Sequence, residues 1–276
     1  MYDLKDKVAL VTGAGGEHGI GRAIAMRLAK EGADVVVNDL TANPKKSSAW
    51  AGLNSVVEEI EGLGRKAIAL EADISNSGQV DLLVQDTVQQ FGHIDILVNN
   101  AGASAGPDRV PIVELDEEVW DQVQNINVKG TFLCCRAVAK ELIKQGQGGK
   151  IINISSIAGT KGVSRFGAYC ASKFAVRGLT QVLAKELGEY GIQVNAICPG
   201  MVITERFYGI AEALAPEGVE TQVFLDEMER EGISDTPLGR VATTDDVAKI
   251  AAFLASSESD FHTGMSFTVD GGRDMY

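Results

Sequence analysis

Short runs of continuously apolar residues alternate along this chain with longer stretches whose apolar residues recur at helical spacing. The apolar runs predict strands at Val8–Val11, Asp34–Asn38, Lys66–Leu70, Ile94–Val98, Lys150–Ile154, Ile192–Ile197 and Met265–Val269. The stretches between them predict helices at Gly21–Lys30, Ala49–Leu63, Val80–Phe91, Trp120–Ile143, Ala168–Leu187 and Val247–Leu254. Apolar runs without polar alternation are typical of a parallel sheet covered by helices on both faces. We therefore predict an α/β fold with a doubly wound, mostly parallel seven-stranded sheet.

The length and rhythm of the chain predict one domain over residues 1–276. A chain of 276 residues is long enough for one large α/β core, and no repeat, low-complexity tract or linker divides it. Two segments interrupt the alternation: Leu40–Ser48 after the second strand, and Glu205–Thr236 after the sixth.

Composition and charge narrow the possible partners. Apolar residues make up 45% and charged residues 23%, which is typical of a soluble globular protein. The net charge of −13 disfavours nucleic acid and anionic membranes as partners. The apolar runs are too short to span a bilayer, and the first residues show no signal-peptide pattern, so we expect a cytoplasmic protein.

Cysteine and histidine give little sign of redox or metal chemistry. The cysteines form no CxxC pair, so we expect free thiols in a reducing compartment at Cys134, Cys135, Cys170 and Cys198. The three histidines are scattered and show no ligand spacing, so we expect no catalytic metal.

The segment from Thr12 to Gly21, TGAGGEHGIG, lies between the first predicted strand and its helix. Glycines there allow the backbone to turn sharply and approach a pyrophosphate, and the helix N-terminus attracts that anion. A tight structural turn is the alternative explanation. Asp39 ends the second strand, where a carboxylate can accept both ribose hydroxyls and repel a 2′-phosphate. Together these features predict a Rossmann-type site for NAD, although Arg22 keeps NADP as an alternative.

The stretch YCASK places the phenol of Tyr169 and the ammonium of Lys173 one helical turn apart. A free tyrosine has a pKa of about 10, too high for a base at neutral pH. A neighbouring lysine and the positive ring of NAD⁺ would lower it. Ser156, at the end of the fifth strand, is placed to hydrogen-bond a substrate oxygen.

Taken together, these motifs resemble the short-chain dehydrogenase/reductase family over nearly the whole chain. The matching motifs are TG…GIG, Asp73-Ile74, NNAG at Asn99–Gly102, Asn127 in NINVKG, Ser156 in NISS, YCASK at Tyr169–Lys173, PGMVIT at Pro199–Thr204, and VDGG at Val269–Gly272.

The resemblance implies a catalytic role for four residues. Tyr169 is expected to be the general base in oxidation and the acid in reduction, and Lys173 to bind the nicotinamide ribose and lower the tyrosine pKa. Ser156 is expected to steady the substrate oxygen, and Asn127 to hold a water that links Lys173 to solvent. Three residues between tyrosine and lysine fit alcohol and ketone chemistry, whereas enoyl reductases of the family use a longer spacing.

The resemblance also implies a set of cofactor contacts. Asp73 and Ile74 are expected to border the adenine, the NNAG segment to line the cofactor floor, and Val202 and Thr204 to contact the carboxamide. The full set expected to contact NAD is Gly13, Gly19, Ile20, Gly21, Asp39, Asp73, Ile74, Asn100, Ala101, Gly102, Tyr169, Lys173, Pro199, Gly200, Val202 and Thr204.

The two interruptions and the glycine loop depart from the family pattern. The loop has five residues where three are usual, and Glu17-His18 either forms a hairpin in solvent or folds over the adenosine and slows cofactor release. Leu40–Ser48 is also longer than in the shortest members, and the simplest interpretation is a surface loop. Insertions at this place also occur in two groups of family members: those that hold NAD tightly and have it reoxidised by an external carrier, and the hydroxyacyl-CoA dehydrogenase modules of larger enzymes.

Residues 205–236 occupy the position of the family's substrate lid. Their many apolar residues suggest a hydrophobic substrate, unless those residues only pack onto the domain. We therefore expect an NAD-dependent oxidoreductase that interconverts a secondary alcohol and a ketone, assembled as a homotetramer through the two longest helices. The alternatives are an NADP-linked carbonyl reductase, a non-catalytic dinucleotide sensor and a sugar-nucleotide epimerase.

Overall fold

The computed structural model describes residues 2–42 and 50–274 and has an α/β architecture. Seven strands form one sheet in the order β3-β2-β1-β4-β5-β6-β7, and every neighbouring pair is parallel. The strands are β1 Val8–Thr12, β2 Asp34–Asp39, β3 Ala67–Glu71, β4 Ile96–Asn99, β5 Gly149–Ile154, β6 Ile192–Pro199 and β7 Ser266–Val269. The predicted doubly wound sheet is confirmed, and it is parallel throughout.

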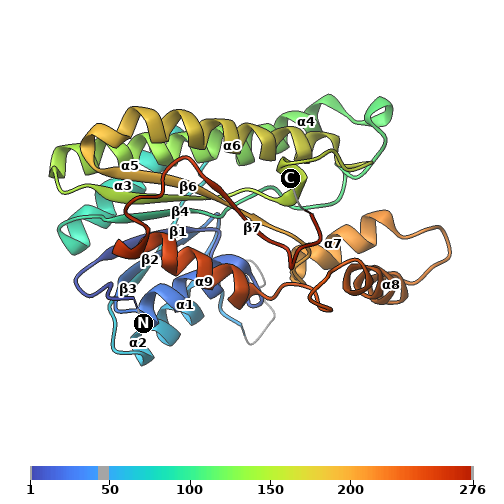
Figure 1. Cartoon of the computed structure of the whole chain (residues 1–276), viewed down its shortest axis with the longest axis horizontal. Helices are drawn as coiled ribbons and strands as arrows, with labels where there is room; N and C mark the ends of the chain where they lie inside the picture. Colours follow the sequence, from blue (N-terminus) through green and yellow to red (C-terminus); the bar gives the residue numbers. More distant parts are fainter. Residues whose placement is uncertain (1, 43–49, 275–276) are drawn as a thin grey trace.

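Helices cover both faces of this sheet (Figure 1). One face carries α1 (Ile20–Lys30), α2 (Leu53–Gly62) and α9 (Thr244–Ala255), whose apolar side chains pack with those of β1 and β2. The other carries α3 (Ser77–Phe91), α5 (Thr131–Gln145) and α6 (Gly167–Leu187), with α4 (Glu117–Gln124) beside α6. The five central strands, β2, β1, β4, β5 and β6, are largely buried, which explains why they lack polar alternation.

The helix expected at Trp120–Ile143 differs from the prediction. It begins earlier, at Glu117, and a π-helical turn over Asn125–Gly130 separates α4 from α5. Helical periodicity does not reveal such a turn, because one extra residue per turn leaves the apolar pattern nearly intact. The helix expected at Ala49–Leu63 begins only at Leu53, and most of the Leu40–Ser48 segment, from residue 43 on, lies outside the described residues.

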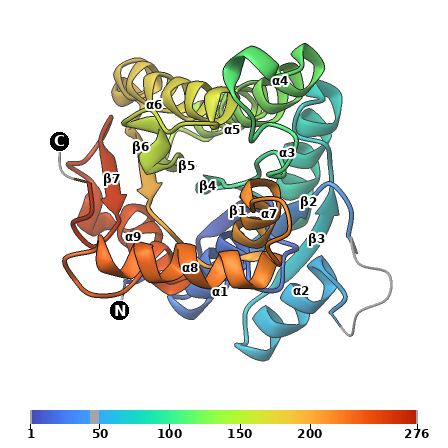
Figure 2. The same ribbon diagram turned by 90° about the vertical axis from the view of Figure 1, so that its right-hand side faces the viewer.

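The segment after β6 forms two helices, α7 (Glu205–Leu214) and α8 (Thr221–Ser234), which we call the lid. Figure 1 shows both helices beyond one end of the two main layers, and in Figure 2, viewed from that end, they lie in front of β1 and α1. The strand order reverses between β1 and β4, so the loops that follow these two strands diverge and leave a crevice there. The lid therefore lies at the edge of the sheet where ligands of such folds bind.

Candidate active site

A cavity of about 1270 Å³ opens at the carboxyl ends of the strands, beneath the lid. Of the residues expected at the cofactor and catalytic sites, Gly21, Asn99 and Asn127 do not line it. The predicted residues that do are Gly13, Gly19, Ile20, Asp39, Asp73, Ile74, Asn100, Ala101, Gly102, Ser156, Tyr169, Lys173, Pro199, Gly200, Val202 and Thr204. The fold thus gathers motifs from the whole length of the chain around one space.

Two glycines make the first turn possible. Gly13 has a φ of +65°, and a Cβ there would lie 2.6 Å from Cα of Ala101. A Cβ on Gly21 would overlap the carbonyl oxygen of Gly13, because α1 begins very close to the end of β1. Gly21 is therefore a packing residue behind the cavity wall.

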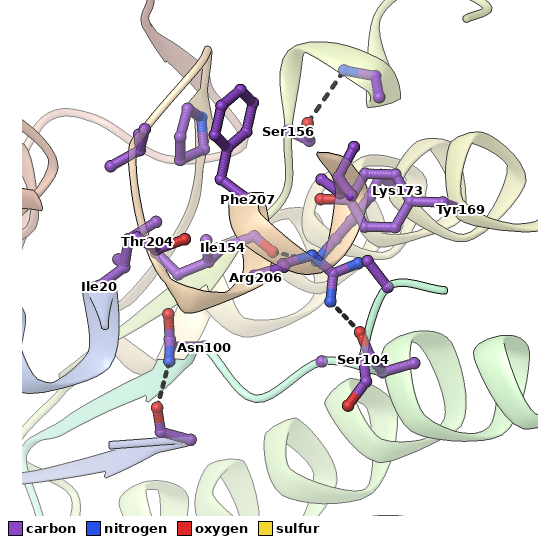
Figure 3. Close-up of a pocket in the computed structure, with 18 of the residues that line it drawn as sticks. Ile20, Asn100, Ser104, Ile154, Ser156, Tyr169, Lys173, Thr204, Arg206 and Phe207 are labelled. Carbon is purple, nitrogen blue, oxygen red and sulfur yellow. Dashed lines mark hydrogen bonds between the residues drawn. The ribbon is translucent and has the colours of Figure 1, made fainter. Parts of the chain in front are cut away.

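The turns after β1 and β4 are locked to each other. The backbone N–H of Asn100 donates to Oγ1 of Thr12 at 3.1 Å, and its side-chain amide donates to the carbonyl of Gly13 at 2.8 Å. Figure 3 shows Asn100 turned toward this turn. The floor of the cavity is therefore fixed by hydrogen bonds.

Asp39 ends β2 at the cavity wall and is held by two backbone groups. Its Oδ2 accepts from the N–H of Gly15 at 2.9 Å, and its Oδ1 accepts from the N–H of Leu40 at 2.8 Å. Arg22 lies nearby but is engaged elsewhere: its guanidinium donates to both carboxylate oxygens of Glu59, at 2.8 and 2.6 Å, and lies 5.0 Å from the ring centre of Trp50.

The two extra residues of the glycine loop are exposed at its tip. Glu17 presents its carbonyl to Arg22 at 2.8 Å. The backbone N–H of His18 donates to Oε1 of Glu205, the first residue of α7, at 3.0 Å. The loop thus contacts the lid, a contact that the sequence does not predict.

Tyr169, Lys173 and Ser156 meet at the inner end of the cavity (Figure 3). Helix α6 carries the first two one turn apart, and the Lys173 ammonium lies 5.6 Å from the Tyr169 ring centre. Lys173 donates to the carbonyl of Ile154, at the end of β5, at 2.8 Å. The Ser156 hydroxyl accepts from the N–H of Ala158 at 3.1 Å and is also hydrogen-bonded to Tyr169.

Opposing effects set the pKa of Tyr169. Burial raises it, but the positive charges of Lys173 and Arg206, the hydrogen bond with Ser156 and the charge of Arg109 lower it by more, so it lies below its ordinary value. Burial also lowers the pKa of Lys173, with Tyr169 opposing that shift. Tyr169 therefore loses its proton more readily than a free tyrosine does.

Asn127 lies in the π turn, completely buried behind the cavity. Its Oδ1 accepts from the N–H of Ala103 at 2.8 Å, and its Nδ2 donates to Oγ of Ser172 at 2.9 Å. It therefore connects the loop after β4 to helix α6. Its expected part in a proton relay stays a prediction.

Two arginines next to the tyrosine were missed from the sequence. The guanidinium carbon of Arg206, on α7, lies 4.8 Å from the Tyr169 ring centre, and that of Arg109 lies 4.9 Å from it. Arg206 directly follows Thr204-Glu205, so its place at the start of the lid was the available signal. Arg109 lies in a loop without periodicity, and nothing in its surroundings marks it.

The remaining chemistry-bearing residues fall outside this cluster. All four cysteines are buried free thiols, and burial raises the pKa of Cys134 to about 12. Within residues 2–42 and 50–274, no group of three His, Cys, Asp or Glu side chains is placed to hold a metal ion. In the same residues, no helix has the length and apolar character needed to cross a membrane.

Comparison with known proteins agrees with this geometry. A family model described as enoyl-(acyl carrier protein) reductase matches residues 13–274. A short-chain dehydrogenase/reductase of Armillaria gallica is 42% identical over 267 residues, covering 96% of this chain and 95% of the relative. A diacetyl reductase [(S)-acetoin forming] of Staphylococcus epidermidis is 40% identical over 266 residues, covering 96% and 98%.

Solved structures agree as well. Carveol dehydrogenase from Mycobacterium avium in complex with NAD superimposes with a TM-score of 0.88 at 29% identity, covering 99% of both chains. The chain therefore belongs to the short-chain dehydrogenase/reductase family of oxidoreductases.

Proposed function

We propose that this protein is an NAD-dependent dehydrogenase that interconverts a secondary alcohol and a ketone. The observation that carries the proposal is the meeting of Tyr169, Lys173 and Ser156 in a cavity that Asp39 also lines. The three-residue spacing between tyrosine and lysine supports alcohol chemistry over reduction of a carbon–carbon double bond.

Four residues of the chain have different roles in the proposed proton transfer. Tyr169, as phenolate, takes the proton from the substrate hydroxyl in oxidation and returns it in reduction. Ser156 donates a hydrogen bond to the substrate oxygen, and Lys173 stabilises the phenolate. Lys173 is held in place by the Ile154 carbonyl, so its charge stays near the ring. Asn127 holds the loop after β4 against α6 and keeps the tyrosine helix in register with the cavity floor.

The residues around the cavity fit NAD. When bound, NAD accepts or donates the hydride of the reaction. Side chains do not fit at Gly13 and Gly21, where the turn after β1 passes close to the start of α1. The N-terminus of α1 is suited to bind a pyrophosphate. Asp39 offers its carboxylate to the adenosine ribose, and the engagement of Arg22 with Glu59 leaves this arginine poorly placed to bind a 2′-phosphate. These contacts support NAD over NADP.

The lid supports a substrate with an apolar body. Four of its apolar residues line the cavity: Phe207, Ile210, Leu214 and Met228. Others of the apolar set, including Tyr208 and Val223, are exposed. Only part of the apolar pattern in the lid therefore faces a substrate.

We further propose that the chain acts as one domain in the cytoplasm, as a homotetramer. Large apolar side chains lie exposed on the outer sides of α5 and α6 and near β7: Phe132, Phe174, Val182, Phe261 and Met265. Contact between copies along these helices and strands would cover them.

The test of the proposed reaction is nicotinamide reduction with NAD⁺ or NADP⁺ and a panel of charged and uncharged secondary alcohols. Turnover with NAD⁺ that is lost in Tyr169→Phe supports the proposal. If no alcohol is oxidised with either nucleotide, purified protein is next examined for co-purifying nucleotide and supplied with an artificial electron acceptor. Absence of turnover under all these conditions would contradict the proposal.

A further inference from the structure

The cations that line the cavity differ in how their charge is balanced. They are Lys161, Lys173, Arg206 and Arg273. Lys161 forms an ion pair with Asp274, and Arg273 pairs with Asp235 at 2.9 Å. Lys173 faces the phenol whose ionised form it stabilises. Arg206 differs from these three cations.

Arg206 has no acidic partner in the part of the chain that the structure describes. One of its terminal nitrogens donates to the carbonyl of Ala103, and its guanidinium lies over the Tyr169 ring (Figure 3). A guanidinium carries five N–H donors in a rigid fork, so this single carbonyl leaves most of them for a ligand. Glu205, the preceding residue, is turned the other way and accepts from His18.

A second guanidinium approaches the same ring. Arg109 is fully buried and stacks on the ring of Phe166 at 4.0 Å. One of its terminal nitrogens pairs with Asp108, but its Nε and Nη2 are buried without a hydrogen-bond acceptor in the described residues. Buried donors normally have partners, but Arg109 does not line the cavity, so these two groups are not available to a substrate there, and Arg206 is the guanidinium that faces the cavity.

We infer that the substrate carries a carboxylate a few bonds from its reacting carbon, and that Arg206 binds this group beside Tyr169. This inference rests on the proposed function and specifies its substrate class. The cavity would then take a hydroxy acid or oxo acid whose apolar body contacts Phe207, Ile210 and Leu214 on α7.

The charge balance of the site supports this choice. Among the cations that line the cavity in the described residues, Arg206 has neither an acidic partner nor, like Lys173, a phenol to stabilise; the acids that line the cavity, Asp39, Asp73 and Glu205, accept from backbone N–H groups. NAD⁺ adds a positive ring to the same region. A carboxylate offers the planar, two-oxygen acceptor that the guanidinium fork fits. The surface as a whole carries a charge of −13, so the attraction for an anion is local to this cavity.

The experiment compares hydroxy acids with their methyl esters, which keep the carbon skeleton and remove the charge. The pairs are 2-hydroxy-4-methylpentanoate, 3-hydroxybutanoate and 4-hydroxypentanoate with their esters, each with NAD⁺. At least one acid is expected to exceed its ester in kcat/KM by about tenfold or more, because a charge-assisted bidentate pair contributes well over 1 kcal/mol. Equal or higher kcat/KM for all three esters would overturn the inference.

Two variants test the residue assigned. Arg206→Gln is expected to reduce the acid-to-ester ratio to near one, and Arg206→Lys to retain part of it. Arg230→Gln removes the same charge from an exposed position on α8 and is expected to keep the ratio. A ratio that survives in Arg206→Gln would overturn the assignment. Melting curves of all variants separate loss of selectivity from loss of folding.

Calorimetric titration with the same acids distinguishes failure of the inference from failure of the proposed function. If neutral alcohols turn over but no acid is preferred, the inference fails and the proposed function stands. Acid binding that is lost in Arg206→Gln but leads to no turnover supports the anion site and contradicts the proposed reaction. With neither binding nor turnover, both fail.

Discussion

Glu205, the first residue of α7, accepts a hydrogen bond from the backbone N–H of His18 at 3.0 Å. This contact joins the tip of the glycine loop to the start of the lid, two segments far apart in the sequence. His18 is one of the five residues between Gly13 and Gly19, where the family usually has three. A longer loop can thus reach the lid across the mouth of the cavity.

Removing this contact is expected to accelerate release of the cofactor. Glu205→Ala should raise the NADH dissociation rate about fivefold, since one charge-assisted hydrogen bond at an exposed position contributes roughly 1 kcal/mol. Stopped-flow fluorescence measures the rate. Glu212→Ala removes the same charge from an exposed position on the same helix and serves as the control. Unchanged release in Glu205→Ala, and in a variant lacking Glu17 and His18, would leave the loop as a plain hairpin.

The pH dependence of oxidation is expected to follow Tyr169. Oxidation needs the phenolate, so kcat/KM should rise with pH and level off with a midpoint below about 10, the ordinary tyrosine value. In reduction the phenol is needed, and activity should fall over the same range. Arg206→Gln removes one of the charges that lower this pKa, so its midpoint should move to higher pH. An unmoved midpoint would mean that the arginine does not act on Tyr169.

Replacing Tyr169 by Phe should lower kcat by about 10²- to 10⁴-fold, the usual contribution of a positioned acid–base group. Tyr190→Phe, on an exposed tyrosine beyond α6, provides the matched control. Rates for both are compared under saturating NAD⁺ and alcohol. Activity of the Tyr169 variant within a few-fold of the parent protein would remove Tyr169 from the mechanism.

Asp39 is expected to decide the choice of nucleotide. Asp39→Asn should lower kcat/KM for NAD⁺ and raise the NADP⁺ to NAD⁺ ratio by about tenfold or more, because a carboxylate that repels the 2′-phosphate is removed. Steady-state kinetics with both nucleotides measure the ratio. Asp81→Asn, at an exposed position on α3, should leave it unchanged. A parent protein that prefers NADP⁺ would contradict the assignment.

The capping box of α9 gives a prediction on stability. Oγ1 of Thr243 accepts from the N–H of Asp246 at 3.2 Å, and the Asp246 carboxylate accepts from the N–H of Thr243 at 2.8 Å. Thr243→Ala should lower the free energy of unfolding by about 1 kcal/mol. Thr244→Ala, at the next residue, should lower the free energy of unfolding by less. Denaturant unfolding measures both, and equal losses would contradict the role of the cap.

The same box predicts how stability changes with acid. Hydrogen bonding from Arg240 holds the pKa of Asp246 well below its usual range, despite the opposing effect of burial. Because the folded-state pKa lies below the unfolded value of about 3.9, the contribution is complete above that pH and is lost as pH falls further. In Thr243→Ala the loss of stability on acidification should be smaller than in the parent protein.

The sequence predicted the sheet because its five central strands are largely buried, so their apolar runs were unbroken, and β1 and β2 were placed to within one residue at their ends. Asp39 and Tyr169 became candidates because Asp39 directly follows an apolar run and Tyr169 precedes Lys173 by one helical turn. The π turn at Asn127 was missed because it hardly disturbs the helical pattern.

Residues that act through tertiary contacts could not be found in this way. Arg206 and Arg109 are 97 positions apart in the numbering; α7 brings Arg206 to Tyr169, and the loop between β4 and α4 brings Arg109 there. The apolar residues of the lid show the same limit. Phe207 and Tyr208 are adjacent and equally apolar in the sequence, yet only Phe207 lines the cavity, since the turn of α7 decides which one faces inward.

Helix α7 is held by neighbouring residues at two places that serve different ligands: Glu205 at the cofactor loop and Arg206 over the tyrosine. A contact that fixes α7 at one of these places reduces the conformational entropy that the helix loses when it is fixed at the other place. Fixing α7 at the cofactor-loop end thus also favours the position of Arg206 over Tyr169, and the effect is reciprocal.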